Sequence, residues 1–242
     1  MPTHKSGHPA ASVPGVPTSS SSASSVAPTP LTSSEENYLK ALYALTEWEN
    51  DPVTTGNIAA QLGVAPASAT SMVAKLAGKK LMVHPRYGAI EFTDAGRLAA
   101  LSVVRRHRLI ETFLLSELGY GWDEVHDEAE HLEHTVSTRF IEALAARLGH
   151  PKADPHGDPI PGPDGTVSMP PAIRLDRFLH PADGSGTPGI AIVSRISDED
   201  PAWLRRCTEL GIAPGSTLEL PDTGLSEIET TMLWVLPAAP EA

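Results

Sequence analysis

The chain has 242 residues, 40% of them hydrophobic, and a formal net charge of −12 at pH 7. Its single cysteine, Cys207, excludes a disulfide framework and a thiolate metal cluster within one chain. The sequence has neither an apolar run long enough for a transmembrane helix nor the apolar segment of a signal peptide, so we expect a cytoplasmic protein.

The first segment, residues 1–30, consists mostly of Ser, Pro, Ala, Thr and Gly. It cannot bury enough apolar surface to offset chain entropy, which predicts a disordered tail. The charge of the remainder is uneven: residues 31–108 carry a net +2, whereas residues 109–242 carry −15. The near-neutral part is therefore the candidate for contact with nucleic acid, and the acidic part is the candidate for metal binding.

A helix-turn-helix pattern follows a first predicted helix. Residues 32–36 offer an N-cap and a capping box, and apolar residues recur at helical spacing to about Glu49. Residues 54–76 then predict a short helix, a turn at Gly63 and a second helix that starts near Pro66. Small side chains on the two helices would let them cross closely.

Two short strands are predicted at 81–84 and 89–92, around a turn at 85–88. A hairpin directly after a helix-turn-helix indicates a winged-helix domain for double-stranded DNA, which we place at 31–96. Small, hydroxylated side chains on the second helix would reach phosphates and base edges, unless they simply face solvent. The candidate DNA contacts are Ala65, Ala67, Ser68, Thr70, Ser71, Lys75 and Arg86.

Two helices are predicted next, one from Thr93 to about Leu118 and one from Trp122 or Asp123 to about His150. Apolar residues cover more than one face of the first helix, which suggests a subunit interface. We therefore expect a homodimer, with a helical metal-binding and dimerisation domain at 97–150.

The second of these helices carries Glu130, Glu133 and His134 at i, i+3 and i+4, so that the three side chains share one face. Two carboxylates and an imidazole suit a divalent metal of intermediate hardness. Glu and His on a helix usually form only a solvated face, so these three residues alone leave a metal site and a solvated helix surface as alternatives.

The C-terminal part divides into a linker and a small module. Proline and glycine are concentrated in 151–188, which predicts a mostly irregular linker with a short helix near 173–179. Alternating strands and a helix predict a β-rich module at 189–242. Its strands are expected at 190–196, 216–220 and 230–236, and its helix at 201–210. The fold class is thus mainly α with α+β parts.

Three motifs resemble those of the diphtheria toxin repressor family of metal-dependent regulators: residues 104–111, 125–134 and 157–162. The resemblance runs from about Ser33 to Leu236 and is greatest to the manganese transport regulator branch, in its longer form with a C-terminal SH3-like (FeoA-like) domain. It implies a winged helix-turn-helix domain, a helical dimerisation domain and a small SH3-like β-barrel. The module is short for the family, which predicts a truncated barrel.

The resemblance also implies two metal sites per subunit, a primary site and an ancillary site. The primary site would hold the metal through Asn37, Glu130, Glu133 and His134. The ancillary site would use His107, Glu111 and His126, with Asp200 as the candidate ligand from the C-terminal module.

This chain departs from the family pattern at two of these positions, Asn37 and Glu130, and also at Lys40. Iron-type members carry cysteine where Glu130 stands and methionine where Asn37 stands, and the exchange of sulfur for oxygen favours Mn²⁺. Short manganese-type members carry aspartate at the position of Asn37 and glutamate at that of Lys40. A protonated lysine cannot coordinate, so we expect two separated sites rather than one two-metal cluster.

The sequence therefore predicts a homodimeric, Mn²⁺-dependent transcriptional repressor that binds operators of metal-uptake genes. An Fe²⁺-dependent regulator of the same family is the alternative, and a hydrolytic metalloenzyme is a third hypothesis. The enzyme hypothesis is disfavoured because the sequence marks no nucleophile, oxyanion hole or phosphate-binding loop, and no small-molecule substrate or membrane partner is expected.

Overall fold

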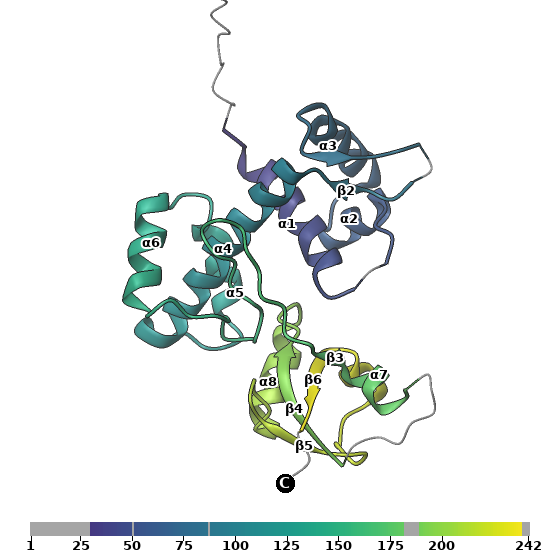
Figure 1. The fold of residues 1–242 in the computed structure, drawn as a ribbon, viewed down its shortest axis with the longest axis vertical. Coiled ribbons are helices and arrows are strands. Elements are labelled where there is room, and N and C mark those ends of the chain that lie inside the picture. Colours follow the sequence, from purple (N-terminus) through teal and green to yellow (C-terminus); the bar gives the residue numbers. More distant parts are fainter. Residues whose placement is uncertain (1–29, 50, 87, 182–188, 239–242) are drawn as a thin grey trace, which may run out of the picture. The chain divides into compact units, whose positions relative to one another are not determined.

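The computed structural model describes residues 30–49, 51–86, 88–181 and 189–238 (Figure 1). The predicted disordered tail lies outside these ranges apart from Pro30, as do residues 182–188 of the predicted linker. Residues from Leu31 onward form one contact unit. No helix in the described ranges has the length and apolarity needed to cross a membrane.

The N-terminal DNA-binding part, residues 31–92, is called the head below, and it has the predicted helix-turn-helix and hairpin. Thr32 caps α1 (Ser33–Glu47) and forms the expected capping box with Glu35. Gly63, with a φ of 62°, turns the chain between α2 (Thr55–Gln61) and α3 (Pro66–Gly78). The hairpin is shorter than predicted, with β1 (Met82–Val83) and β2 (Glu91–Phe92) pairing antiparallel over two residues each.

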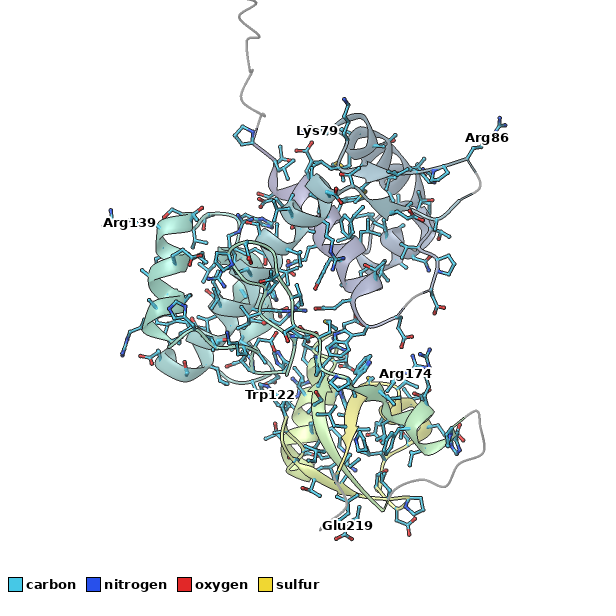
Figure 2. All side chains as sticks on the ribbon, in the orientation of Figure 1. Lys79, Arg86, Trp122, Arg139, Arg174 and Glu219 are labelled. Atoms are coloured by element: carbon cyan, nitrogen blue, oxygen red, sulfur yellow. The ribbon has the colours of Figure 1, made fainter. Side chains whose placement is uncertain are left out.

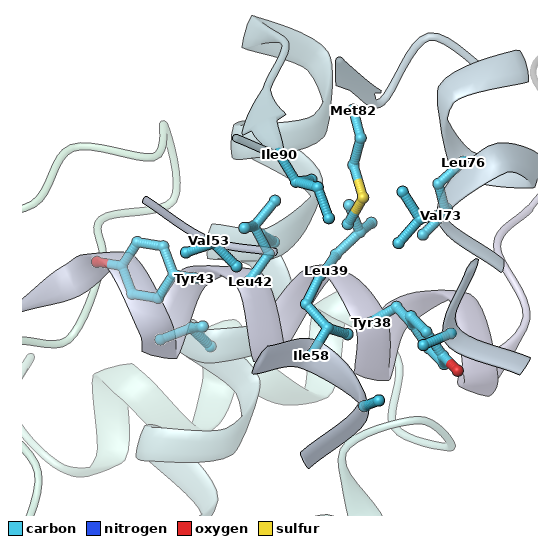
Figure 3. Packing of buried hydrophobic residues seen from close by; sticks show 14 of the residues in the cluster. Tyr38, Leu39, Leu42, Tyr43, Val53, Ile58, Val73, Leu76, Met82 and Ile90 are labelled. Carbon is cyan, nitrogen blue, oxygen red and sulfur yellow. The ribbon is translucent and has the colours of Figure 1, made fainter. Parts of the chain in front are cut away.

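One apolar cluster holds the head together (Figure 3). Leu39 and Leu42 of α1 and Ile58 of α2 are fully buried in it, as are Val73 and Leu76 of α3. Because this core fixes α3 on its inner side, the opposite side of α3 is left exposed.

The helical part begins with α4 (Asp94–Leu118), capped by Thr93 as predicted. The single helix predicted for 122–150 is wrong, because two helices stand there: α5 (Val125–Leu132) and α6 (Thr138–Arg147), both packed against α4 (Figure 1). Ser137 causes the break, since its hydroxyl accepts a hydrogen bond from Phe140 N and caps a new helix.

The C-terminal module is a small antiparallel sheet in the order β3-β6-β4-β5, packed with three short helices. The predicted strand at 190–196 and helix at 201–210 match the structure, whereas the start of the strand predicted at 230–236 is helical. α7 matches the short helix predicted near 173–179, whereas β3 was not predicted and extends the sheet across the expected domain boundary. The elements are β3 (Ile173–Arg174), α7 (Leu175–Leu179), β4 (Ile190–Ile196), α8 (Pro201–Leu210), β5 (Thr217–Glu219), α9 (Glu227–Thr230) and β6 (Leu233–Pro237).

The segment between α6 and β3 is irregular, as predicted, but its first part is packed into the molecule. Asp154, His156 and Asp158 are buried, and so is Ile160. Backbone hydrogen bonds join Ile196 N of β4 to His156 O and Ile160 N to Lys152 O. These residues therefore connect the helical part to the C-terminal sheet.

Candidate metal centre

His107 of α4 stands between the two predicted metal sites. Its Nδ1 lies 2.6 Å from Glu133 Oε2, and its Nε2 lies 2.9 Å from Glu111 Oε1 and 3.3 Å from His126 Nδ1. Burial alone would lower the pKa of His107, but the carboxylates of Glu111 and Glu133 outweigh burial and raise it. The two sites are thus neighbours that share a hydrogen-bonded histidine.

The predicted primary site gathers around Glu133, which is fully buried at the end of α5. His134 Nε2 lies 3.3 Å from Glu133 Oε1, and His134 Nδ1 lies 2.6 Å from Glu36 Oε2 on α1. A carboxylate accepts the hydrogen from Nδ1, so Nε2 is the ring nitrogen that faces Glu133. Asn37 Oδ1 and His134 Nε2 are both buried and make no hydrogen bond within the described ranges.

Lys40 places an ammonium group in this same site. Its Nζ lies 2.5 Å from Glu130 Oε1 and 2.6 Å from Glu133 Oε1. The position of Lys40 on α1 thus brings a positive charge to the carboxylates that the sequence predicts as metal ligands. Lys40 cannot itself be a ligand in this protonated form.

The predicted ancillary site contains His107, Glu111 and His126, but its fourth member is Asp198 rather than Asp200. Asp198 Oδ2 lies 2.9 Å from His126 Nδ1, and His126 Nδ1 lies 3.4 Å from Glu111 Oε1. Asp200 instead caps α8 by accepting a hydrogen bond from Ala202 N at 2.8 Å. Asp198 follows directly after β4 ends, which places it beside the helices. The structure thus places Asp198, two residues before the predicted Asp200, beside His126 and Glu111.

The charges of this group are strongly interdependent. Burial alone would lower the pKa of His126, but Asp198 and Glu111 raise it to about 11. Burial would raise the pKa of Glu111 and of Asp198, but the neighbouring histidines hold both pKa values below their usual range. In the absence of metal the histidines thus supply the positive charge that balances the buried carboxylates.

A cavity of about 210 Å³ adjoins both sites. It is lined by Asn37 and Lys40 from α1, His126 and Glu130 from α5, and Asp198 from the C-terminal module. Neither Glu36 nor Asp198 was predicted to lie at the centre. Glu36 was predicted as a capping residue, although its position one residue before Asn37 could have placed it near the primary site.

The candidate DNA contacts lie on the surface of the head. Residues 65, 67, 68, 70, 71 and 75 are all exposed on or just before α3. Thr70 Oγ1 donates to Pro66 O, and Lys75 Nζ lies 3.1 Å from the buried Glu35. Arg86 extends from the outer end of the loop between β1 and β2 (Figure 2). The predicted residues therefore form one helix face and one hairpin tip.

Three family models match the chain in succession. The N-terminal DNA binding domain of iron dependent repressors matches residues 30–90, their metal binding and dimerisation domain matches 93–162, and a FeoA domain matches 187–226. The diphtheria toxin repressor of Corynebacterium diphtheriae is 33% identical over 195 residues, covering 79% of this chain and 86% of that protein. The chain belongs to the diphtheria toxin repressor family.

Other members of the family have names that refer to different metals. The iron-dependent repressor IdeR of Mycobacterium leprae is 29% identical over 196 residues, covering 77% of this chain and 83% of that protein. A solved structure of a manganese-dependent transcriptional repressor in complex with manganese is 41% identical, with a TM-score of 0.75, and covers 84% of this chain and 100% of that chain.

Membership identifies the chain as a metal-dependent transcriptional repressor with a DNA-binding domain and a dimerisation domain. The family consists of repressors rather than enzymes, so the metalloenzyme hypothesis is rejected. The buried atoms without hydrogen-bond partners fit such a role, since Asn37 Oδ1, His134 Nε2 and both carboxylate oxygens of Glu111 offer lone pairs to a cation.

Proposed function

We propose that the chain is a homodimeric repressor activated by Mn²⁺, which binds double-stranded operator DNA of metal-uptake genes. The choice of Mn²⁺ rests on the donor atoms of the predicted primary site. Asn37, Glu130, Glu133 and His134 offer oxygen and nitrogen atoms and no sulfur, and oxygen-rich sites suit Mn²⁺. The similarity to a manganese-dependent repressor supports the same choice.

The proposed mechanism depends on which elements carry these donors. Asn37 lies on α1 of the DNA-binding head, whereas Glu130 and Glu133 lie on α5 and at its end. Asn37, Glu130 and Glu133 would hold a divalent cation, which would add positive charge beside these carboxylates when bound. Glu36 holds His134 and Lys40 contacts Glu130 and Glu133, so α1 is already joined to the residues around α5, and a metal bound by Asn37 would add a further link.

A fixed link between α1 and α5 would set the angle of each head relative to the dimer. Two recognition helices must enter major grooves one helical turn, about 34 Å, apart or a multiple of it, so the head angle controls DNA affinity. The metal then acts through its higher affinity for the arrangement that matches DNA. The residues proposed to enter the major groove of the DNA are Ala65, Ala67, Ser68, Thr70, Ser71 and Lys75, and Arg86 is proposed to contact the phosphate backbone.

Activation by Fe²⁺ is the second candidate, because several relatives are named as iron-dependent repressors. Divalent-metal affinity generally increases from Mn²⁺ to Fe²⁺, so tightness of binding alone does not favour Mn²⁺. Anaerobic DNA-binding titrations with each metal at equal occupancy would distinguish the two.

The test of the function uses DNA duplexes selected from a random library in the presence of the protein and Mn²⁺. We expect Mn²⁺ to raise the affinity of the wild type for these duplexes at least tenfold, and we expect Glu133→Ala to abolish that increase. Asp127→Ala is the matched control, because Asp127 is an exposed carboxylate on the same helix. Equal DNA affinity with and without metal in all three proteins would reject the proposal.

A further inference from the structure

A third group of metal-type donors lies beside the ancillary site and was not predicted from the sequence. It consists of Glu111 on α4 and of Asp154 and His156 in the irregular segment after α6. One donor atom from each residue lies within 4.8 Å of the others. Glu111 and His156 are completely buried, and Asp154 is 8% exposed.

The hydrogen bonds of His156 define which ring nitrogen is free. Its Nε2 lies 3.1 Å from the carbonyl oxygen of Trp122, and a carbonyl oxygen can only accept, so Nε2 carries the hydrogen. Nδ1 then holds a lone pair, and it is buried with no hydrogen-bond partner within the described ranges. The ring is also stacked on Trp122, with centroids 5.4 Å apart. A histidine that donates one N–H to a carbonyl and presents its other nitrogen is the usual arrangement of a metal ligand.

The two carboxylates differ in their partners, because Glu111 lacks hydrogen bonds whereas one oxygen of Asp154 is held by the backbone. Neither oxygen of Glu111 makes a hydrogen bond within the described part of the chain, although Oε1 lies 2.9 Å from His107 Nε2. Asp154 Oδ1 is held in place by two backbone donors, His156 N and Asp158 N. Two buried carboxyl groups are therefore crowded together beside His156 at this point.

Arginine does not fully relieve this crowding. The Nε of Arg108 lies 3.4 Å from Asp154 Oδ2, but the same guanidinium group also pairs with Glu47 and lies 3.4 Å from Asp158. A proton shared between the two carboxylates would reduce their repulsion but would leave His156 Nδ1 without a partner. A divalent cation satisfies all three donors at once.

We propose that Glu111, Asp154 and His156 Nδ1 form a third site for a divalent cation of the Mn²⁺ type. The inference rests on the proposed function, because Glu111 would bridge this ion to the one held by His107, Glu111, His126 and Asp198. Two carboxylates and one imidazole make a donor set of intermediate hardness. Since His156 O accepts a hydrogen bond from Ile196 N, the ion would also fix the C-terminal sheet to α4.

The test counts Mn²⁺ ions per subunit of the full chain after equilibrium dialysis. His156→Phe keeps an aromatic ring for stacking on Trp122 but removes the donor nitrogen, so we expect it to bind one ion fewer than the wild type. His131→Phe is the matched control, since His131 is exposed on α5 and belongs to none of the three groups. In electron paramagnetic resonance spectra, we expect a spin-coupled Mn²⁺ pair in the wild type and its loss in His156→Phe.

Asp154→Asn is the second variant, used in case His156→Phe does not fold. It keeps an oxygen that can accept the two backbone hydrogen bonds, and we expect it to weaken binding of the last ion at least tenfold. Equal ion counts in wild type, His156→Phe and Asp154→Asn, together with Mn²⁺-dependent DNA binding, would overturn the third site and leave the proposed function standing. Failure of the wild type to bind any Mn²⁺ would reject both.

Discussion

At the scale of single residues, Lys40 distinguishes this centre from a plain set of metal ligands. Its ammonium group contacts two carboxylates, and its side chain is only 16% exposed. Without metal, Lys40 therefore acts as the resident counter-charge for Glu130 and Glu133. With metal, the same charge opposes the incoming cation, so Lys40 sets a balance between the stability of the metal-free protein and metal affinity.

This balance predicts opposite effects of Lys40→Gln on two measurable quantities. The metal-free protein should lose about 1–3 kcal/mol of unfolding free energy, because Glu130 and the buried Glu133 lose the cation that they share. The affinity for Mn²⁺ should rise at least tenfold, about 1.4 kcal/mol, because a repelling charge is removed. Urea unfolding with a chelator and calorimetric titration with Mn²⁺ measure the two effects. Lys152→Gln, at an exposed position, should change neither; a fall in Mn²⁺ affinity on Lys40→Gln would contradict the argument.

The sequence predicted contacts between residues on one helix more reliably than contacts between residues of distant segments. His107 and Glu111 are one helical turn apart on α4, so local geometry was enough to pair them. Asp198 and His156 could not be found in this way, because they reach the centre through the fold of distant segments. Glu130, Glu133 and His134 were predicted on one continuous helix, yet α5 ends at Leu132 and the last two residues lie beyond it.

At the scale of elements, bounds were predictable where a cap or breaker defines them locally. Pro201 begins α8 and Gly211 ends it with a φ of 68°, and the predicted helix at 201–210 matches. The break between α5 and α6 was missed because the apolar pattern continues across it. β3 was missed because a two-residue strand has no periodicity, and it exists only through pairing with β6.

The first turn of α4 lies against the residue that precedes β1, and this close contact gives a testable prediction. At Gly96, in the first turn of α4, an added Cβ would lie 1.7 Å from the backbone oxygen of Leu81. Gly96→Ala must therefore shift α4 away from the start of β1, and we expect a loss of about 1–3 kcal/mol of unfolding free energy in urea. Gly78→Ala at the end of α3 meets nothing within 4 Å and should be neutral or stabilising by about 0.4–1 kcal/mol. Equal stability of the two variants would show that no close approach exists.

At the scale of the whole molecule, Arg195 of β4 joins segments that are distant in the sequence. Its Nε lies 2.7 Å from the buried Asp158 Oδ1, to which Trp48 Nε1 at the end of α1 also donates, at 2.8 Å. The guanidinium carbon lies 4.2 Å from the ring centre of Trp234 and 5.2 Å from that of Trp48. The head, the irregular segment and the C-terminal sheet thus share one buried charge pair, and sequence periodicity alone could not predict it.

Removing this arginine should loosen the C-terminal sheet without changing its own core. Arg195→Ala leaves Asp158 buried with Arg108 as its remaining cation 3.4 Å away, so we expect a loss of about 2–4 kcal/mol, slightly below that of a fully unpaired buried charge. Arg205→Ala is the matched control from the same module, because the side chain of Arg205 is 59% exposed where it pairs with Asp123 and should contribute about 0–1 kcal/mol. Urea unfolding measures the stabilities, and hydrogen exchange should show faster exchange in the segment around Asp158 and at the end of β4 for Arg195→Ala only. If both variants lose the same stability, the buried pair does not link the module to the rest of the chain.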